Sequence, residues 1–168
     1  PYFVEVQKTY KGLTTLYATS KLGVDRWLSC LAAWSKYKKN LIVVDAGTAI
    51  TVDFIDYTGT HLGGLITPGP TILGNALAGS TAHLPVVSRG EAKMIVPTDT
   101  EEAIGIGLDT LLLGFMNQVK AECSQIYDSD PLWVLTGGAA NTISAGIKWP
   151  HFTEQNLVLD GLKIFANG

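Results

Sequence analysis

The sequence contains few cysteines, few charges and no long hydrophobic run. Its two cysteines, Cys30 and Cys123, show no C-x-x-C spacing, which argues against a zinc or redox motif and favours buried thiols in a reducing cytoplasm. Twelve Lys and Arg residues stand against 15 acidic ones, and no basic stripe indicates nucleic-acid binding. Neither a bilayer-length apolar run nor a signal peptide is present. We therefore expect a cytoplasmic protein that binds neither nucleic acid nor membrane.

The signatures of two large enzyme classes are also missing. The chain has no G-x-S-x-G segment and no Walker loop, which removes most support for a Ser/His hydrolase or a P-loop enzyme. His61, His83 and His151 lie far apart without the spacing of metal ligands. We interpret these three histidines as incidental polar residues.

What is present is the composition of a compact α/β protein. The 168 residues are 46% hydrophobic and 16% charged and include 18 glycines. A chain of this length buries a substantial core. The low charge fraction also indicates that some apolar surface meets a partner.

Hydrophobic periodicity predicts the order of the elements. Strands are predicted at 2–6, 41–45, 49–56, 60–66, within 131–136 and at the start of 156–168. Helices are predicted within 19–37, 67–85, 99–127, 139–147 and at the end of 156–168, with a loop at 84–99. Short turns between the three central strands predict an antiparallel meander. The order from residue 41 is then βββαβαβα, an α/β fold with a mixed sheet flanked by helices, typical of a ribonuclease-H-like (actin-like ATPase) domain.

The turn Asp45-Ala46-Gly47-Thr48 is the first candidate site. Gly47 allows close approach of a ligand, and the turn's N–H groups and the Thr48 hydroxyl can bind one anion. Asp45 would repel that anion unless a cation lies between them. An ordinary hairpin turn explains the same residues equally well.

The second candidate is the segment Gly23-Val24-Asp25-Arg26-Trp27. An aspartate beside an arginine at a helix N-terminus can act as a general base toward a substrate hydroxyl. The alternative is a helix cap followed by a solvated arginine.

Two glycine pairs are weaker candidates. Gly63-Gly64 on a strand, before Pro68-Gly69-Pro70, predicts close approach of a backbone or a ligand, or a tight packing corner. The segment Thr136-Gly137-Gly138-Ala139 either admits a nucleotide ring or permits close packing.

These motifs occur in one distinctive order. They are "LGVDRW" at 22–27, "VVDAGTAITVD" at 43–53, "GTHLGGLITPG" at 59–69, "STAHLP" at 80–85, "DTEEAIGIG" at 99–107 and "LTGGAA" at 135–140. In this order and spacing the chain resembles the type III pantothenate kinases, a branch of the acetate and sugar kinase, Hsp70 and actin superfamily.

The resemblance implies ATP-dependent phosphorylation of pantothenate to 4′-phosphopantothenate, the first step of coenzyme A biosynthesis. Asp25 would be the catalytic base. The pantothenate-binding residues would be Tyr17, Gly23, Val24, Asp25, Arg26 and Thr100. Among these, Tyr17 is the nearest candidate for a family tyrosine, and Thr100 matches a contact near a dimer interface.

The resemblance also implies an ATP site. Gly47 and Thr48 would contact ATP phosphates, Asp45 would bind a monovalent cation, K⁺ or NH₄⁺, and Mg²⁺ would accompany ATP. Phosphoryl transfer needs charge neutralisation and an aligned base, which Arg26, Asp25 and the cations would supply.

Finally, the resemblance implies a homodimer and two domains. Residues 1–40 would be a substrate-binding segment and linking helix left from a mostly missing N-terminal domain, and 41–168 the second ribonuclease-H-like domain. We expect the N-terminally truncated chain to be inactive alone. Two alternatives to a pantothenate kinase remain: a non-catalytic accessory protein of the same fold, or a kinase for another small alcohol.

Overall fold

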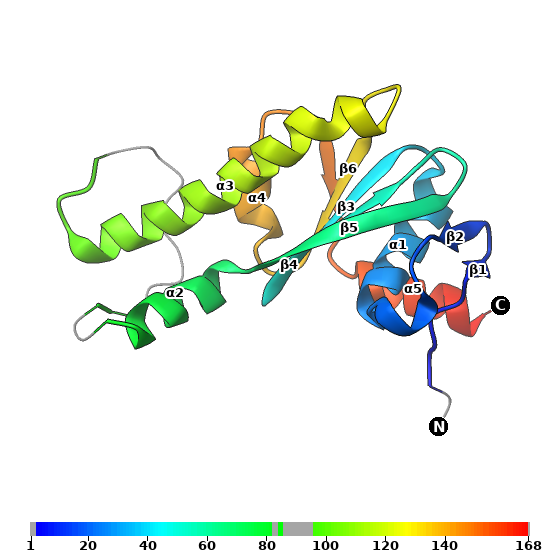
Figure 1. Ribbon diagram of the computed structural model, residues 1–168, viewed down its shortest axis with the longest axis horizontal. Helices are drawn as coiled ribbons and strands as arrows, with labels where there is room; N and C mark the ends of the chain where they lie inside the picture. The colour runs from blue at the N-terminus through cyan, green and yellow to red at the C-terminus, as the bar shows by residue number, and fades with distance from the viewer. Residues whose placement is uncertain (1–2, 82–83, 86–95, 168) are drawn as a thin grey trace.

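A seven-stranded sheet with helices on both faces forms the part of the protein that the computed structural model describes, residues 3–81, 84–85 and 96–167 (Figure 1). The strands are Thr9–Tyr10 (β1), Leu13–Thr15 (β2), Leu41–Ala46 (β3), Ala49–Ile55 (β4), Thr60–Pro68 (β5), Leu132–Thr136 (β6) and His151–Thr153 (β7). The helices are Thr19–Lys21 (η1, 3₁₀), Val24–Tyr37 (α1), Pro70–Gly79 (α2), Thr100–Ile126 (α3), Ala140–Gly146 (α4) and Leu157–Ala166 (α5).

The sheet order is β1-β2-β5-β4-β3-β6-β7. Strands β3, β4 and β5 form the predicted antiparallel meander, while β6 and β7 continue the sheet in parallel with β3. On the other side, β2 pairs with β5 in parallel and β1 with β2 antiparallel. The order from β3 onward is therefore βββαβαβα, as predicted, with α2 and α3 filling the first helical position.

Two hydrophobic cores cover the two faces of the sheet. Helices α3 and α4 lie on one side of the strands, and α1 and α5 lie on the other (Figure 1). Ile42 and Val44 of β3 face a core built with α3 and α4, whereas Leu41 and Val43 face a core built with α1 and α5. Alternate residues of a strand point to opposite faces, so a strand covered on both sides needs apolar residues at successive positions. The run of four apolar residues in β3 has this cause.

The predicted strand at 2–6 is wrong. Residues 3–7 form neither helix nor strand, and the first strands are instead β1 and β2, joined by a tight turn in which Lys11 and Gly12 have φ values of 44° and 84°. Val4 and Val6 pack against the α1–α5 core, while Phe3 is 83% exposed. The alternating apolar residues of this segment therefore pack one of its sides on the core, although the segment pairs with no strand.

The predicted strand at the start of 156–168 is also wrong. The last strand is β7, and α5 already begins at Leu157. Leu157 and Gly161 are buried four residues apart, the spacing of one helix face. A Cβ on Gly161 would collide with the backbone of Leu28, so this glycine lets α5 pack closely on α1.

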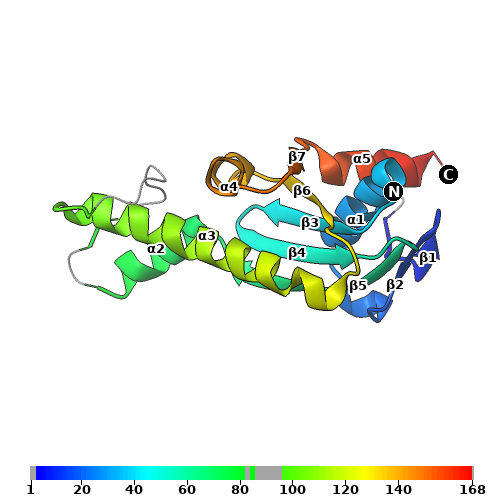
Figure 2. The ribbon, with the colours of Figure 1, turned by 90° about the horizontal axis from the view of Figure 1, so that it is seen from above.

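Helices α2 and α3 lie together and extend beyond the sheet (Figures 1 and 2). Asp99 caps α3 by accepting hydrogen bonds from the backbone N–H groups of Glu101 and Glu102 at 2.9 and 3.1 Å. No helix in the described ranges is long and apolar enough to cross a membrane.

Candidate functional site

The first turn of α1 presents Asp25 to solvent. Gly23 occupies the N-cap position without a side-chain cap. Asp25 follows two residues later, where its negative charge interacts favourably with the helix dipole. Its Oδ1 accepts a hydrogen bond from the backbone N–H of Arg26 at 2.9 Å. A Cβ on Gly23 would lie 2.6 Å from that oxygen, so the glycine leaves room for the carboxylate. Asp25 is thus exposed, and its carboxylate is oriented by the Arg26 backbone.

Arg26 points from α1 into the protein and is only 6% exposed. Its Nε and Nη2 donate to the Oδ2 and Oδ1 of Asp53 at 3.1 and 2.5 Å, a bidentate pair. Burial by itself would lower the pKa of Arg26, but the hydrogen bonds and charge of Asp53 outweigh it and raise that pKa. The alternative of a solvated arginine is therefore wrong.

Gly64 makes room for this ion pair. A Cβ at Gly64 would collide with Nη2 of Arg26 and with the Val52 carbonyl, and would lie 2.6 Å from Oδ1 of Asp53. The close approach predicted from the glycine pair is thus, at Gly64, a protein packing contact. Gly63 has a φ of 147° beside an irregularity in the β4–β5 pairing, and position 63 lies near the Tyr17 ring.

Tyr17 covers the buried ion pair. Its ring stacks on the imidazole of His61, with centroids 5.5 Å apart and planes at 9°. The guanidinium carbon of Arg26 lies 5.2 Å from the Tyr17 ring centroid, a cation–π distance. The structure therefore brings Tyr17 and Arg26 together, although they lie on opposite sides of η1 in the sequence.

Asp45 ends the buried run of β3 and shares a sheet face with Asp53. Burial raises the pKa of Asp45, and the charges of Asp25 and Asp53 raise it further. Asp45 thus lies close enough to two other carboxylates for their charges to act on it, which concentrates negative charge at this end of β3. Asp53 is already engaged by Arg26, so Asp45 is the carboxylate that fits a bound cation, because carboxylate oxygens are hard ligands.

The turn after Asp45 is held between two glycine-containing segments. The Gly69 N–H donates to the carbonyl of Thr48 at 2.9 Å, and the Ala139 N–H donates to the carbonyl of Ala46 at 2.9 Å. Gly137, with a φ of 88°, lies against Asp45: a Cβ there would come within 2.6 Å of the Asp45 Oδ1. Both glycine motifs therefore pack on the candidate phosphate turn.

A hollow of about 380 Å³ opens at this turn. It is lined by Ala46, Gly47, Thr48, Pro70, Thr71, Gly138 and Ala139. These side chains are small, and Gly47 and Thr48 are exposed in it. The N-terminus of α2, beginning at Pro70, also faces the hollow, and free N–H groups at helix starts favour anions.

Thr100 is not brought to this site within the chain. It is the first residue of α3, which begins at the end of the α2–α3 pair that lies away from α1 in both views (Figures 1 and 2). The sequence prediction placed Thr100 with Asp25 on the strength of a resemblance to proteins that assemble as dimers.

Sequence reasoning missed Asp53 and misjudged His61. Asp53 is 1% exposed and His61 0% exposed, and both lie in the buried network around Arg26, so His61 is not incidental. A usable signal was present, because Asp53 stands between Val52 and Phe54 in a strand, and a carboxylate there needs a partner. His151 is half-buried and hydrogen-bonded to Ser144 and Trp149, whereas His83 lies outside the described residues.

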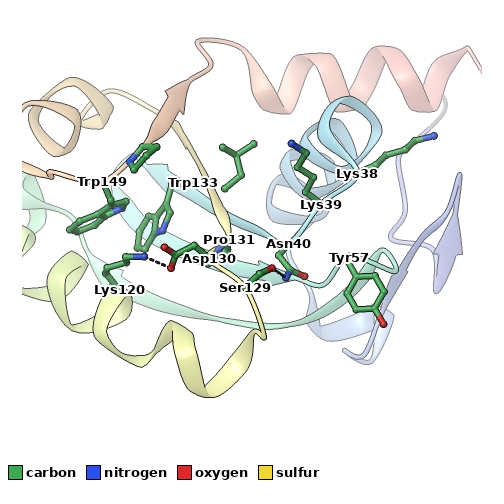
Figure 3. A pocket seen from close by; sticks show the side chains of 12 residues that line it. Lys38, Lys39, Asn40, Tyr57, Lys120, Ser129, Asp130, Pro131, Trp133 and Trp149 are labelled. Carbon is green, nitrogen blue, oxygen red and sulfur yellow. Dashed lines mark hydrogen bonds and ion pairs between the residues drawn. The ribbon is translucent and has the colours of Figure 1, made fainter.

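A second hollow, of about 450 Å³, lies at the other end of the β3–β6 pair, beside Asn40 and Pro131 (Figure 3). Its carboxylate, Asp130, is engaged by Lys120 at 2.6 Å. None of the residues predicted to bind substrate lines this hollow.

Comparison with known proteins gives one consistent family. A family model described as type III pantothenate kinase matches residues 1–125. The type III pantothenate kinase of Hahella chejuensis is 35% identical over 167 residues, covering 99% of this chain and 68% of that protein. The one from Nitrosomonas eutropha is 36% identical over 171 residues, covering 99% and 65%. The chain thus spans about two thirds of the length of these relatives.

Solved structures support the fold. A protein described as a Baf family transcriptional activator from Campylobacter jejuni matches with a TM-score of 0.65 and 24% identity, over 92% of this chain and 67% of that one. The Alp12 filament structure matches with a TM-score of 0.54 and 16% identity, over 83% and 51%. At these identities the likeness concerns the arrangement of the chain.

Proposed function

This chain belongs to the type III pantothenate kinase family, and we propose that the protein carrying it transfers the γ-phosphoryl group of ATP to pantothenate. The product would be 4′-phosphopantothenate, in the first step of coenzyme A biosynthesis. One observation carries the proposal. The exposed carboxylate of Asp25 lies close enough to Asp45 for its charge to raise the pKa of Asp45, and the turn that follows Asp45 lines an open hollow, although the two residues come from separate elements.

Pantothenate would bind at the start of α1. Asp25 accepts the proton of the attacking hydroxyl as general base, and Gly23, Val24 and the Tyr17 ring line the approach. Arg26 is held by Asp53. Its role is therefore to keep a positive charge in a fixed place at the site and to position the Tyr17 ring, which its guanidinium contacts.

ATP phosphates would bind at Gly47 and Thr48 in the hollow of small side chains. The N–H groups of such a turn and of the α2 N-terminus donate to anionic oxygens. Mg²⁺ bound with ATP would neutralise phosphate charge, while the protein's own residues would orient the phosphates and exclude bulk water from the hollow.

A monovalent cation, K⁺ or NH₄⁺, would bind at Asp45. The support is the excess of carboxylate charge, since Asp45 lies close enough to Asp25 and Asp53 for their charges to raise its pKa. When bound, the cation offsets the repulsion between this carboxylate and the ATP phosphates.

The substitution Asp45→Asn tests this cation site through stability. The pKa of Asp45 is raised from 3.8, so the ionised carboxylate is less favourable in the folded protein than in the unfolded chain. The stability contributed by the protonated carboxyl group is fully present below pH 3.8 and is lost as the pH rises through the raised pKa. At pH 7 in potassium-free buffer, we expect Asp45→Asn to melt a few degrees above the unmodified protein while its turnover no longer responds to potassium. Asp128→Asn, at an exposed carboxylate, is the matched control. A lower melting temperature for Asp45→Asn would contradict the assignment.

We propose a homodimer as the working unit. Thr100 begins α3 at the end that lies away from α1, the helix that carries Asp25, so a partner's α3 would supply this pantothenate contact across the interface. Exposed apolar side chains on the elements leading to and forming the α2–α3 pair support such an interface: Leu65, Ile66, Leu77 and Leu111.

The buried thiols of Cys30 and Cys123 agree with a reducing cytoplasm.

Coupled ATP consumption by the full-length protein tests the activity. We expect turnover to require pantothenate, to rise with potassium and to yield a product heavier by one phosphoryl group. An analogue of pantothenate without the 4′-hydroxyl is the control and should give background rates. If neither pantothenate nor potassium raises turnover, the kinase assignment fails, and a response to another small alcohol alone would move it to that substrate.

A further inference from the structure

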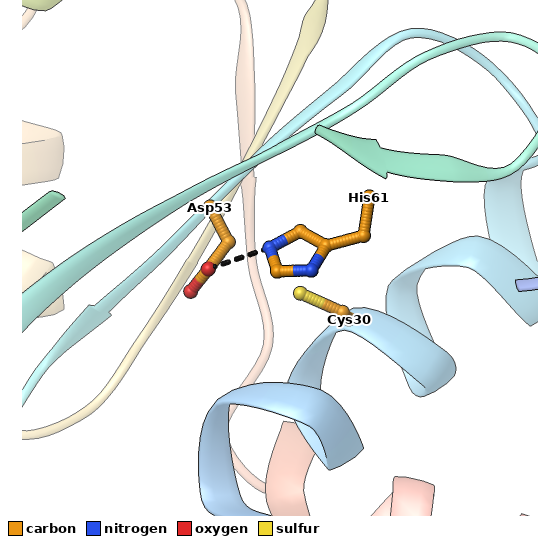
Figure 4. Close-up of side chains that lie close together, drawn as sticks. All are labelled: Cys30, Asp53 and His61. Carbon is orange, nitrogen blue, oxygen red and sulfur yellow. Dashed lines mark hydrogen bonds and ion pairs between the residues drawn. The ribbon is translucent and has the colours of Figure 1, made fainter. Parts of the chain in front are cut away.

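A chain of buried polar groups runs behind the Arg26–Asp53 pair. His61 lies on β5 within reach of Asp53 on β4 and of Cys30 on α1 (Figure 4). Its Nε2 lies 2.8 Å from Oδ1 of Asp53, and its Nδ1 lies 2.9 Å from Oγ1 of Thr15. Thr15 and His61 are both 0% exposed. Burying such polar groups destabilises a protein unless their hydrogen bonds are complete.

The cluster is not arranged as a metal site. Ligand atoms of Cys30, Asp53 and His61 lie within 4.8 Å of one another, which is the spacing of a metal centre. However, both Asp53 oxygens already accept hydrogen bonds from Arg26, whose positive charge would repel a metal ion. Burial, followed by the charge of Asp53, raises the pKa of the Cys30 thiol, so it does not supply a thiolate.

The hydrogen bonds between these buried groups can all be satisfied in one direction. The backbone N–H of Tyr17 donates to Oγ1 of Thr15 at 3.2 Å, and the Thr15 hydroxyl can donate its hydrogen to Nδ1 of His61. Nε2–H of His61 then donates to the Asp53 carboxylate, as Arg26 does from the other side. Nε2 of His61 therefore faces the Asp53 carboxylate, and Nδ1 faces the Thr15 hydroxyl.

We propose that His61 is a positioning residue that sets both Tyr17 and Arg26 at the pantothenate site. The inference rests on the proposed function. Through Asp53 the imidazole fixes the guanidinium of Arg26, and through Thr15 it fixes the backbone of Tyr17. Its ring also supports the Tyr17 ring by stacking at 5.5 Å. His61 itself does not touch substrate, because it is fully buried.

The kinetic test uses His61→Leu and His61→Gln in the full-length protein. Leucine fills much of the space but donates no hydrogen bond, so we expect the KM for pantothenate to rise about tenfold or more, which corresponds to about 1.4 kcal/mol, while the KM for ATP stays within about twofold. Glutamine can still donate to Asp53 and should recover part of the loss. His151→Leu removes a half-buried imidazole with two hydrogen bonds away from the site and is the matched control for general destabilisation.

Nitrogen-15 NMR of the labelled protein supplies a test that needs no activity. We expect a protonated Nε2 and an unprotonated Nδ1 for His61, and a slowly exchanging Nε–H for Arg26 that exchanges faster in His61→Leu. An unchanged pantothenate KM in His61→Leu, or an unchanged Arg26 signal in that variant, overturns the proposal. If the unmodified protein has no turnover with pantothenate, the proposed function fails, and the Arg26 signal alone decides whether His61 positions these residues.

Discussion

Replacing Asp25 with Asn is expected to lower the kcat for pantothenate phosphorylation by about 10²–10⁴-fold, the usual contribution of a general base. Asparagine keeps the size of the side chain and an oxygen that accepts the hydrogen bond from the Arg26 backbone N–H at 2.9 Å. It cannot take a proton from the substrate hydroxyl. The KM for ATP should change little, because we propose that ATP binds at the turn of Gly47 and Thr48. Steady-state kinetics of the full-length protein measure both values.

Asp160→Asn is the matched control for Asp25→Asn. Asp160 is also an acid in the first turn of a helix, α5, and is paired with the exposed Lys163 at 2.9 Å. We expect this variant to retain kcat, which would show that loss of a first-turn charge is not the cause of the Asp25 effect. If Asp25→Asn keeps full activity while turnover still requires pantothenate, another group is the base and the kinase assignment stands.

Asp53→Ala is expected to destabilise the protein by about 3–5 kcal/mol, the range for breaking a buried ion pair on one side. Arg26 is 6% exposed, so its guanidinium would remain buried without a counter-charge, and Nε2–H of His61 would lose its acceptor as well. Denaturant unfolding of the full-length protein, followed by the tryptophan fluorescence, measures the change as a shift in the midpoint.

Two further variants separate the buried pair from an ordinary surface pair. Asp160→Ala removes the partner of Lys163, an exposed pair three residues apart, and should cost less than about 1 kcal/mol. The double variant Arg26→Met, Asp53→Leu replaces both charges by apolar groups and should recover much of the stability that Asp53→Ala loses. A cost below about 1 kcal/mol for Asp53→Ala would show that Arg26 reaches solvent or another partner.

The elements that the sequence predicted correctly depend on neighbours in the chain. Asp99 caps α3 with bonds to residues two and three positions on, and this arrangement is readable from an aspartate before two glutamates. The buried run of β3 and the short turn after it likewise predict a hairpin from local pattern alone. The family resemblance of ordered motifs, from "LGVDRW" to "LTGGAA", was also visible without coordinates.

The wrong predictions arose where one pattern serves two structures. Alternation at 2–6 predicts a strand, but Val4 and Val6 only pack on the core, since β1 occupies the edge of the sheet. The apolar residues at 157–159 suit a strand equally well until α1 is placed, because only then do Leu157 and Gly161 meet it as one helix face.

By itself the sequence determined the family, the α/β element order and the candidates Asp25, Asp45 and Thr48. The family depends on the order of short motifs along the chain, and each candidate depends on residues a few positions apart. Only the tertiary structure decided that Arg26 is buried against Asp53, that His61 contacts Asp53 and that Tyr17 contacts Arg26. These residues are brought together by α1 and by neighbouring strands β4 and β5, with Gly64 leaving space between them. Contacts of this kind carry no periodic signal in the chain, since they depend on where separate elements pack.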